Sequence, residues 1–96
     1  MATKSLQYEK MAAVIKSMAH PMRMHILLLL DENEELTVSD LIEAMGVRQT
    51  AISQHLQKMK LHGLLGAKRR GKFIFYHLKD RYLIEIIEIL KRAMID

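Results

Sequence analysis

Several kinds of residue are scarce or missing in this 96-residue chain, and each absence removes a class of function. The chain contains no cysteine, which excludes disulfides, thiolate metal sites and thiol-based redox sensing within it. No unbroken apolar run is longer than that of Ile26–Leu30, and the N-terminus lacks a secretory h-region, so we expect no membrane span and a cytoplasmic protein. We also expect no enzyme, because no glycine-rich phosphate loop, nucleophile with a spaced base or apolar carboxylate pair is present.

Half of the residues are apolar, which favours one globular domain over residues 1–96 rather than disorder. The single proline separates two helical patterns, at about 5–19 and about 21–31. It does so because the residue before a proline avoids the α region, whereas Pro21 itself suits a first helical turn. The run Ile26–Leu30 predicts that the second of these helices is the most buried element.

Residues 37–63 have the pattern of a helix-turn-helix. Thr37, with Asp40 three residues on, is a good helix cap, and Gly46 supplies the tight turn between the two helices. The first helix has a wide apolar stripe, which consists of Val38, Leu41, Ile42 and Met45. The stripe of the second helix is narrower and consists of Ile52, Leu56 and Met59. The second helix leaves mostly amide and hydroxyl groups outward, which suits reading base edges in a DNA major groove. The residues expected at base edges are Gln49, Thr50, Ser53 and Gln54.

After Gly63 the pattern changes to the alternation of a strand. We therefore predict a hairpin, with a first strand at about 65–69 and a second strand ending at Leu78. The turn between them would be Arg70-Gly71-Lys72, with a positive φ at the glycine. The basic tip suits contact with a phosphate or a minor groove. The alternative is a soluble turn that touches nothing.

Charge is unevenly distributed along the chain, although the net value is only +4. Residues 31–47 carry six acidic side chains and no lysine or arginine, whereas residues 48–81 carry nine basic side chains and one acid, Asp80. Positive potential therefore gathers on the second helix and the hairpin, where DNA phosphates would lie, unless this is only a solvated cationic face. The residues expected at the backbone or minor groove are Arg48, Lys58, Lys60, Arg69, Arg70 and Lys72. His55 is a further candidate, for a phosphate or for packing against its own helix.

The last helical pattern, at about 80–95, is apolar over more than half of its circumference. So small a domain does not bury all of that surface, and we infer a homodimer interface built from this helix and the first one. The alternative is a helix that belongs only to the core of its own subunit. The expected interface residues are Met11, Ile15, Leu83, Ile86, Ile87, Leu90 and Met94.

The five histidines do not form a metal-binding pattern. None is paired with another at i, i+4, and no carboxylate cluster accompanies them, so structural roles are favoured and neither a metal nor another cofactor is expected. A site assembled across the fold or across a dimer stays open.

The segments AHPMRMHILLLL, ELTVSDLIEAMG and TAISQHL, followed by Gly63-Leu64, Gly71 and Tyr76, together resemble the ArsR/SmtB family of small dimeric repressors. The resemblance covers about residues 8–95. It implies a mainly α winged helix-turn-helix fold with the order α-α-α-α-β-β-α and a dimer formed by the first and last helices. It also implies binding to an imperfect inverted repeat in double-stranded DNA, with release on an inducer.

Three departures from the family's pattern limit what the resemblance carries over. Thr37 and Ser39 stand where the best-known members have cysteine metal ligands, and the last helix has no histidine for the second type of family metal site. Arg48 stands where a small hydroxyl residue usually caps the reading helix. Arginine cannot cap the exposed amides, but it is able to contact phosphate directly.

The sequence therefore predicts a dimeric DNA-binding regulator, and it favours a repressor over an activator. Two alternatives stay open. One is a sensor in which a small molecule or a non-thiolate metal at the dimer interface releases DNA. The other is a protein-interaction module that docks through its hydrophobic last helix and has no specific DNA target. The operator, the inducer and the regulated genes do not follow from the sequence.

Overall fold

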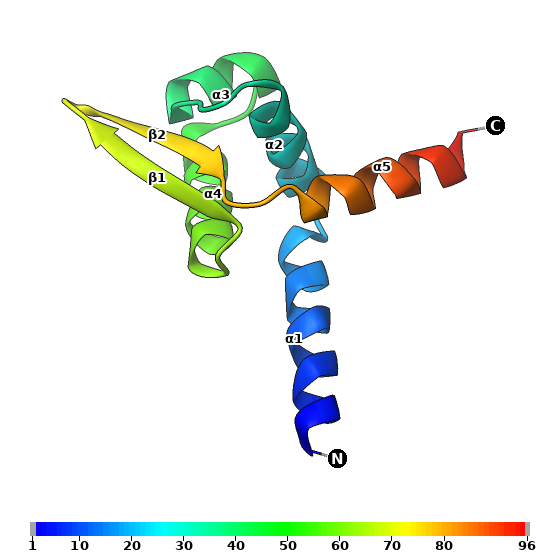
Figure 1. The fold of residues 1–96 in the computed structure, drawn as a ribbon. Coiled ribbons are helices and arrows are strands. Elements are labelled where there is room, and N and C mark those ends of the chain that lie inside the picture. The colour runs from blue at the N-terminus through cyan, green and yellow to red at the C-terminus, as the bar shows by residue number, and fades with distance from the viewer. Residues whose placement is uncertain (1, 96) are drawn as a thin grey trace.

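The structure is a computed structural model and describes residues 2–95. Its elements are α1 (Ala2–Met18), α2 (Pro21–Glu32), α3 (Val38–Met45), α4 (Gln49–Leu61), β1 (Leu65–Arg70), β2 (Phe73–Leu78) and α5 (Tyr82–Met94). This order confirms the predicted winged helix-turn-helix. In Figure 1, α2, α3 and α4 form the central body, the hairpin projects to one side, and α1 and α5 project in two other directions.

Local sequence signals set the boundaries of α2 and α3. Pro21 occupies the first turn of α2, as its fixed φ favours. At α3 the capping box is complete, since the Asp40 N–H donates to Thr37 Oγ1 at 3.1 Å and the Thr37 N–H donates to Asp40 Oδ2 at 2.9 Å. Gly46 ends the helix with a φ of 65°, in the left-handed region that favours glycine. The tight turn that leads into α4 follows from these residues.

One hydrophobic core joins the helices to the base of the hairpin. The predicted inner stripe of α4, which is Ile52, Leu56 and Met59, is fully buried in this core. It packs there with Ile26 and Leu27 of α2 and Leu41 of α3. Leu36, just before α3, forms a β-bridge with Tyr76 of β2 through hydrogen bonds of 3.0 and 2.8 Å. The sequence did not predict this bridge, which ties the hairpin to the helix-turn-helix.

The hairpin is antiparallel, and its two strands pair from Leu65 opposite Leu78 to Arg70 opposite Phe73. Strand β1 therefore runs through Arg70, which the sequence placed in the turn, and the turn is Gly71-Lys72. Gly71 has the expected positive φ, 62°. A type II′ hairpin turn prefers a glycine with positive φ at its first turn position, and the twist of such a turn matches the twist of the two strands.

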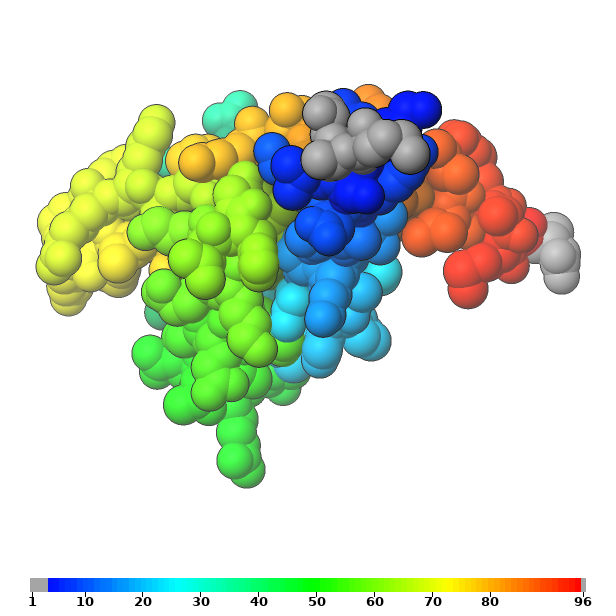
Figure 2. Space-filling view, turned by 90° about the horizontal axis from the view of Figure 1, so that it is seen from below, coloured from blue at the N-terminus to red at the C-terminus, as the bar shows by residue number. Residues whose placement is uncertain are grey.

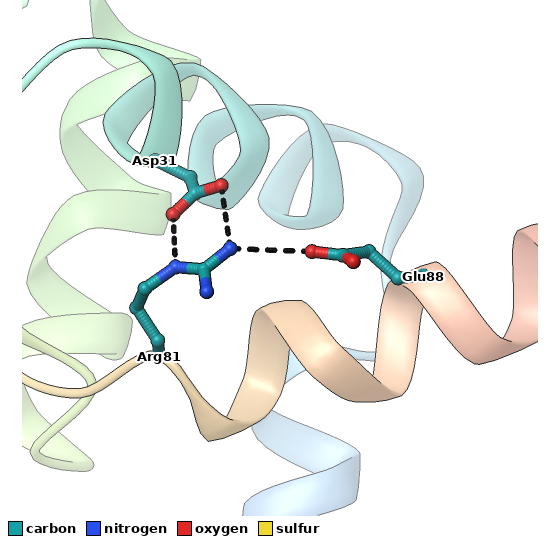
Figure 3. Close-up of polar contacts among 3 residues, drawn as sticks. All are labelled: Asp31, Arg81 and Glu88. Carbon is teal, nitrogen blue, oxygen red and sulfur yellow. Dashed lines mark hydrogen bonds and ion pairs between the residues drawn. The ribbon is translucent and has the colours of Figure 1, made fainter.

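Arg81 fastens the start of α5 to the end of α2. Its Nε and Nη2 donate to the two carboxylate oxygens of Asp31 at 2.6 and 3.1 Å, and Nη2 also donates to Glu88 at 3.2 Å (Figure 3). Hydrogen bonding from Arg81 lowers the pKa of Asp31. Because these side chains are solvent-accessible, the cluster orients α5 more than it stabilises the fold.

Helix α5 divides its apolar surface between the core and solvent. Leu83 and Ile87, which we expected at the subunit interface, are only 3% and 4% exposed because they pack with Ile84 into the core of their own subunit. They therefore leave the predicted interface. The other predicted interface residues are exposed or nearly so, and they are Met11, Ile15, Ile86, Leu90 and Met94. None of the helices in residues 2–95 is long and apolar enough to cross a bilayer.

Candidate nucleic-acid interface

The outer face of α4 presents the polar side chains that the sequence assigns to base edges. Gln49, Thr50 and Gln54 are exposed and Ser53 is half-buried, while the opposite stripe of the helix anchors it in the core. Ser53 and Gln54 line a shallow depression with Gln57 and Lys58. Figure 2 shows the green surface that contains α4 between the yellow hairpin and the blue α1. The face is accessible to a large, extended ligand.

Arg48 precedes α4 and makes no side-chain cap hydrogen bond. The first N–H groups of a helix have no partner within the helix, and the helix dipole is positive at this end. An uncapped helix start beside an exposed guanidinium is a favourable place for a phosphate.

The tip of the hairpin is basic, but its three cations are held differently. Arg69 Nε donates to the Gly71 carbonyl at 3.2 Å, and both Arg69 and Lys72 are exposed. Arg70 instead forms an ion pair with Glu35 in the loop before α3, and its guanidinium lies over the Phe75 ring, 4.6 Å from the centroid. A phosphate contact by Arg70 would therefore compete with its ion pair to Glu35.

Two of the expected residues lie away from the outer face of α4. Lys60 lines a separate depression at the base of the hairpin, with Lys68 and Lys79. His55 is half-buried, and its Nδ1 accepts a hydrogen bond from Arg23 Nε at 3.1 Å. Desolvation, followed by nearby positive charges, lowers the pKa of His55. Of the two roles left open for His55, the geometry favours packing within the subunit.

Sequence reasoning did not single out Glu35 or the role of Arg23. Their partners are 35 and 32 residues away, so no local spacing signals either contact. Within residues 2–95, no group of three or more His, Cys, Asp or Glu side chains gathers where a metal ion would be held.

The sequence and the fold are similar to those of known regulators. Residues 18–65, half of the chain, match a family model described as a helix-turn-helix domain. An uncharacterized HTH-type transcriptional regulator of Methanocaldococcus jannaschii is 36% identical over 88% of this chain and 94% of its own. The HTH-type transcriptional repressor SmtB of Mycobacterium tuberculosis is 34% identical over 77% of this chain and 54% of its own. The chain belongs to the ArsR/SmtB family.

The family assignment extends to solved structures. The crystal structure of the transcriptional repressor PagR of Bacillus anthracis is similar with a TM-score of 0.78 at 34% identity, over 90% of this chain and 98% of that one. As a member of this family of winged helix-turn-helix proteins, the chain is a DNA-binding transcription regulator and not an enzyme. The interaction module without a DNA target is the less favoured alternative.

Proposed function

We propose that this regulator is a homodimeric repressor that binds an inverted repeat in double-stranded DNA, one half-site per subunit. The observation that carries the proposal is the outer face of α4, which is polar, accessible and flanked by a basic hairpin. In a two-fold dimer, each α4 would enter a major groove, with the two helices about one DNA turn (~34 Å) apart. Among the relatives, SmtB and PagR are named repressors and HlyU of Vibrio cholerae is named a transcriptional activator, and the proposal follows the repressors.

The dimer is supported by the apolar side chains that α1 and α5 leave in solvent. On α1 these include Tyr8, Met11 and Ile15, and on α5 Ile89 and Leu90. Monomeric proteins rarely expose large contiguous apolar patches, and a two-fold interface buries the same patch on both subunits. The proposed interface uses these faces, which leave the outer face of α4 uncovered.

Within each half-site we assign base edges and backbone to different side chains. Gln49, Thr50, Ser53 and Gln54 would contact base edges, since amide and hydroxyl groups match the donors and acceptors of the major groove. The phosphate or minor-groove contacts would come from basic residues, which are Arg48, Lys58, Arg69, Arg70 and Lys72, and from Lys60 at the base of the hairpin.

The experiment that tests this function is fluorescence-anisotropy binding to a fragment carrying the protein's own promoter and to random DNA, at two salt concentrations. We expect a promoter preference of at least several hundredfold, on the order of the specific-to-nonspecific ratio of such proteins, and an affinity that falls steeply with salt. Equal, weak binding to both DNAs would overturn the proposal and favour the interaction module.

Gln54→Ala is expected to weaken promoter binding by about 1–3 kcal/mol and to relax the sequence preference, because it removes a direct contact to a base edge. Binding to random DNA should change little. The matched control is Gln7→Ala, which removes an exposed glutamine from α1. If Gln54→Ala discriminates between promoter and random DNA as well as the wild type does, the base-reading assignment is wrong.

Arg70→Ala is expected to weaken binding to promoter and random DNA by similar factors and to lower the salt slope by about one, because one phosphate contact is lost. Glu35→Gln should act in the opposite direction, since it frees the guanidinium that Glu35 now holds. Lys10→Ala removes an exposed cation of α1 and serves as the control. Unchanged affinity in both Arg70→Ala and Glu35→Gln would remove Arg70 from the DNA contacts.

A further inference from the structure

Arg23 lies where three helices meet. It belongs to the first turn of α2, its Nη1 donates to the Ser17 carbonyl near the end of α1 at 2.9 Å, and its Nε donates to Nδ1 of His55 on α4 at 3.1 Å. One half-buried guanidinium thus connects the proposed dimerisation helix, the second helix and the reading helix. A hydrogen bond at such a junction fixes the position of α4 relative to α1.

Both histidines at this junction accept a hydrogen bond through Nδ1. His55 accepts from Arg23, and His20 accepts from the backbone N–H of Met22, which caps the start of α2. The two rings are 4.4 Å apart between centroids. Since a neutral imidazole accepts at one nitrogen and an imidazolium at neither, both hydrogen bonds require neutral rings.

The charges around His55 oppose its protonation. The basic groups near the ring come from the start of α2 and from α4 itself, and they are His20, Arg23 and Lys58. Lys16 of α1 and His62 after α4 line the same cleft as Arg23 and Lys58. Among the described residues, no charged group of α3 or β1 acts on the ring, and no carboxylate bonds to either histidine or to Arg23. A proton on either ring therefore adds a like charge and removes an acceptor at once.

We propose that Arg23 is a positioning residue for DNA recognition, which holds α4 in register with α1 through the neutral ring of His55. Protonation of His55 on acidification removes the acceptor of Arg23, breaks this connection and weakens DNA binding. The inference rests on the proposed function, because DNA affinity is its readout. It makes the regulator sensitive to protons through a site that contains neither cysteine nor metal.

The direction of the effect separates this role from ordinary electrostatics. Protonating a histidine on a DNA-facing surface adds a positive charge and strengthens binding to phosphates. The junction predicts the reverse, since its protonation loosens the helix that carries the base contacts. Weaker binding at lower pH is therefore the signature of the proposed coupling.

The test measures promoter affinity by fluorescence anisotropy between about pH 7.5 and about pH 5, a range that reaches below the ordinary histidine pKa because the pKa of His55 is lowered. For the wild type we expect an affinity about tenfold lower at the acidic end, the loss expected for a hydrogen bond to a charged group. His55→Gln keeps a side-chain oxygen that accepts from Arg23 but does not titrate. It should lose most of the pH dependence, relative to its own affinity at neutral pH. Arg23→Gln should bind weakly at every pH.

The matched control is His25→Gln, which removes an exposed histidine of α2 and should keep the wild-type profile. Circular dichroism at each pH verifies that every variant is folded. A wild-type affinity that is constant or rises on acidification would overturn the inference, as would a His55→Gln profile like that of the wild type.

If the wild type binds no promoter DNA at neutral pH, the proposed function fails on its own account. The coupling between His55 and α4 is then tested by following the NMR spectrum as the pH is lowered. Amide resonances of α4 that shift together with the His55 ring would support the coupling, and amide resonances that stay fixed would overturn it.

Discussion

Leu90→Asp is expected to convert the protein to a monomer and to lower its affinity for the promoter by at least ~100-fold, because two linked half-sites gain about that much from being bound together. Leu90 is 45% exposed on the solvent side of α5, away from the core residues of that helix. The carboxylate would be well hydrated in a monomer. At an apolar interface it would be buried without a partner, which opposes association.

Sedimentation velocity and promoter anisotropy on the same sample check this expectation together. The control is Ser39→Asp, which adds the same carboxylate to the exposed first turn of α3, where the helix dipole favours it, and should leave the sedimenting mass unchanged. A Leu90→Asp protein that remains a dimer would place the interface elsewhere. A monomer that binds the promoter like the wild type would show that one α4 suffices for recognition.

The arrangement of α5 explains why this interface was only partly predictable. An apolar stripe at helical spacing identifies a helix that must be covered, but it does not say by what. The sequence assigned Leu83 and Ile87 to a partner subunit, whereas the fold uses them with Ile84 in its own core. The direction of α5 depends on its attachment to α2 through Arg81 and Asp31, 50 residues apart (Figure 3).

Features that depend on near neighbours were predictable, and this holds for most of the candidate site. The Thr37–Asp40 capping box, the turn at Gly46 and the two faces of α4 each follow from spacings of a few residues. The polar contacts that adjust the site do not. Arg70 with Glu35 and Arg23 with His55 join residues more than 30 positions apart, and each arginine has several acceptors of equal chemical merit in the sequence.

The largest loss of stability is expected from Leu56→Ala, which should reduce the free energy of unfolding by about 3 kcal/mol. Leu56 is fully buried on the inner stripe of α4, where its side chain fills the space between α4 and the rest of the core. Truncation leaves a cavity in addition to the lost burial. For a domain of this size we expect the melting temperature to fall by more than ~10 °C, measured by thermal unfolding with circular dichroism.

Leu61→Ala is the matched control, because the same substitution five residues along α4 removes a side chain that is 83% exposed. It should change the stability by no more than about 0.5 kcal/mol. Well below its melting temperature, Leu56→Ala should still prefer the promoter to random DNA, since Gln49, Thr50 and Gln54 are exposed and do not pack in the core with Leu56. Lost discrimination in a protein of unchanged stability would contradict both this packing and the assignment of the outer face to DNA. Lost stability with retained discrimination means that the two faces of α4 act separately, one as the anchor and the other as the reading surface.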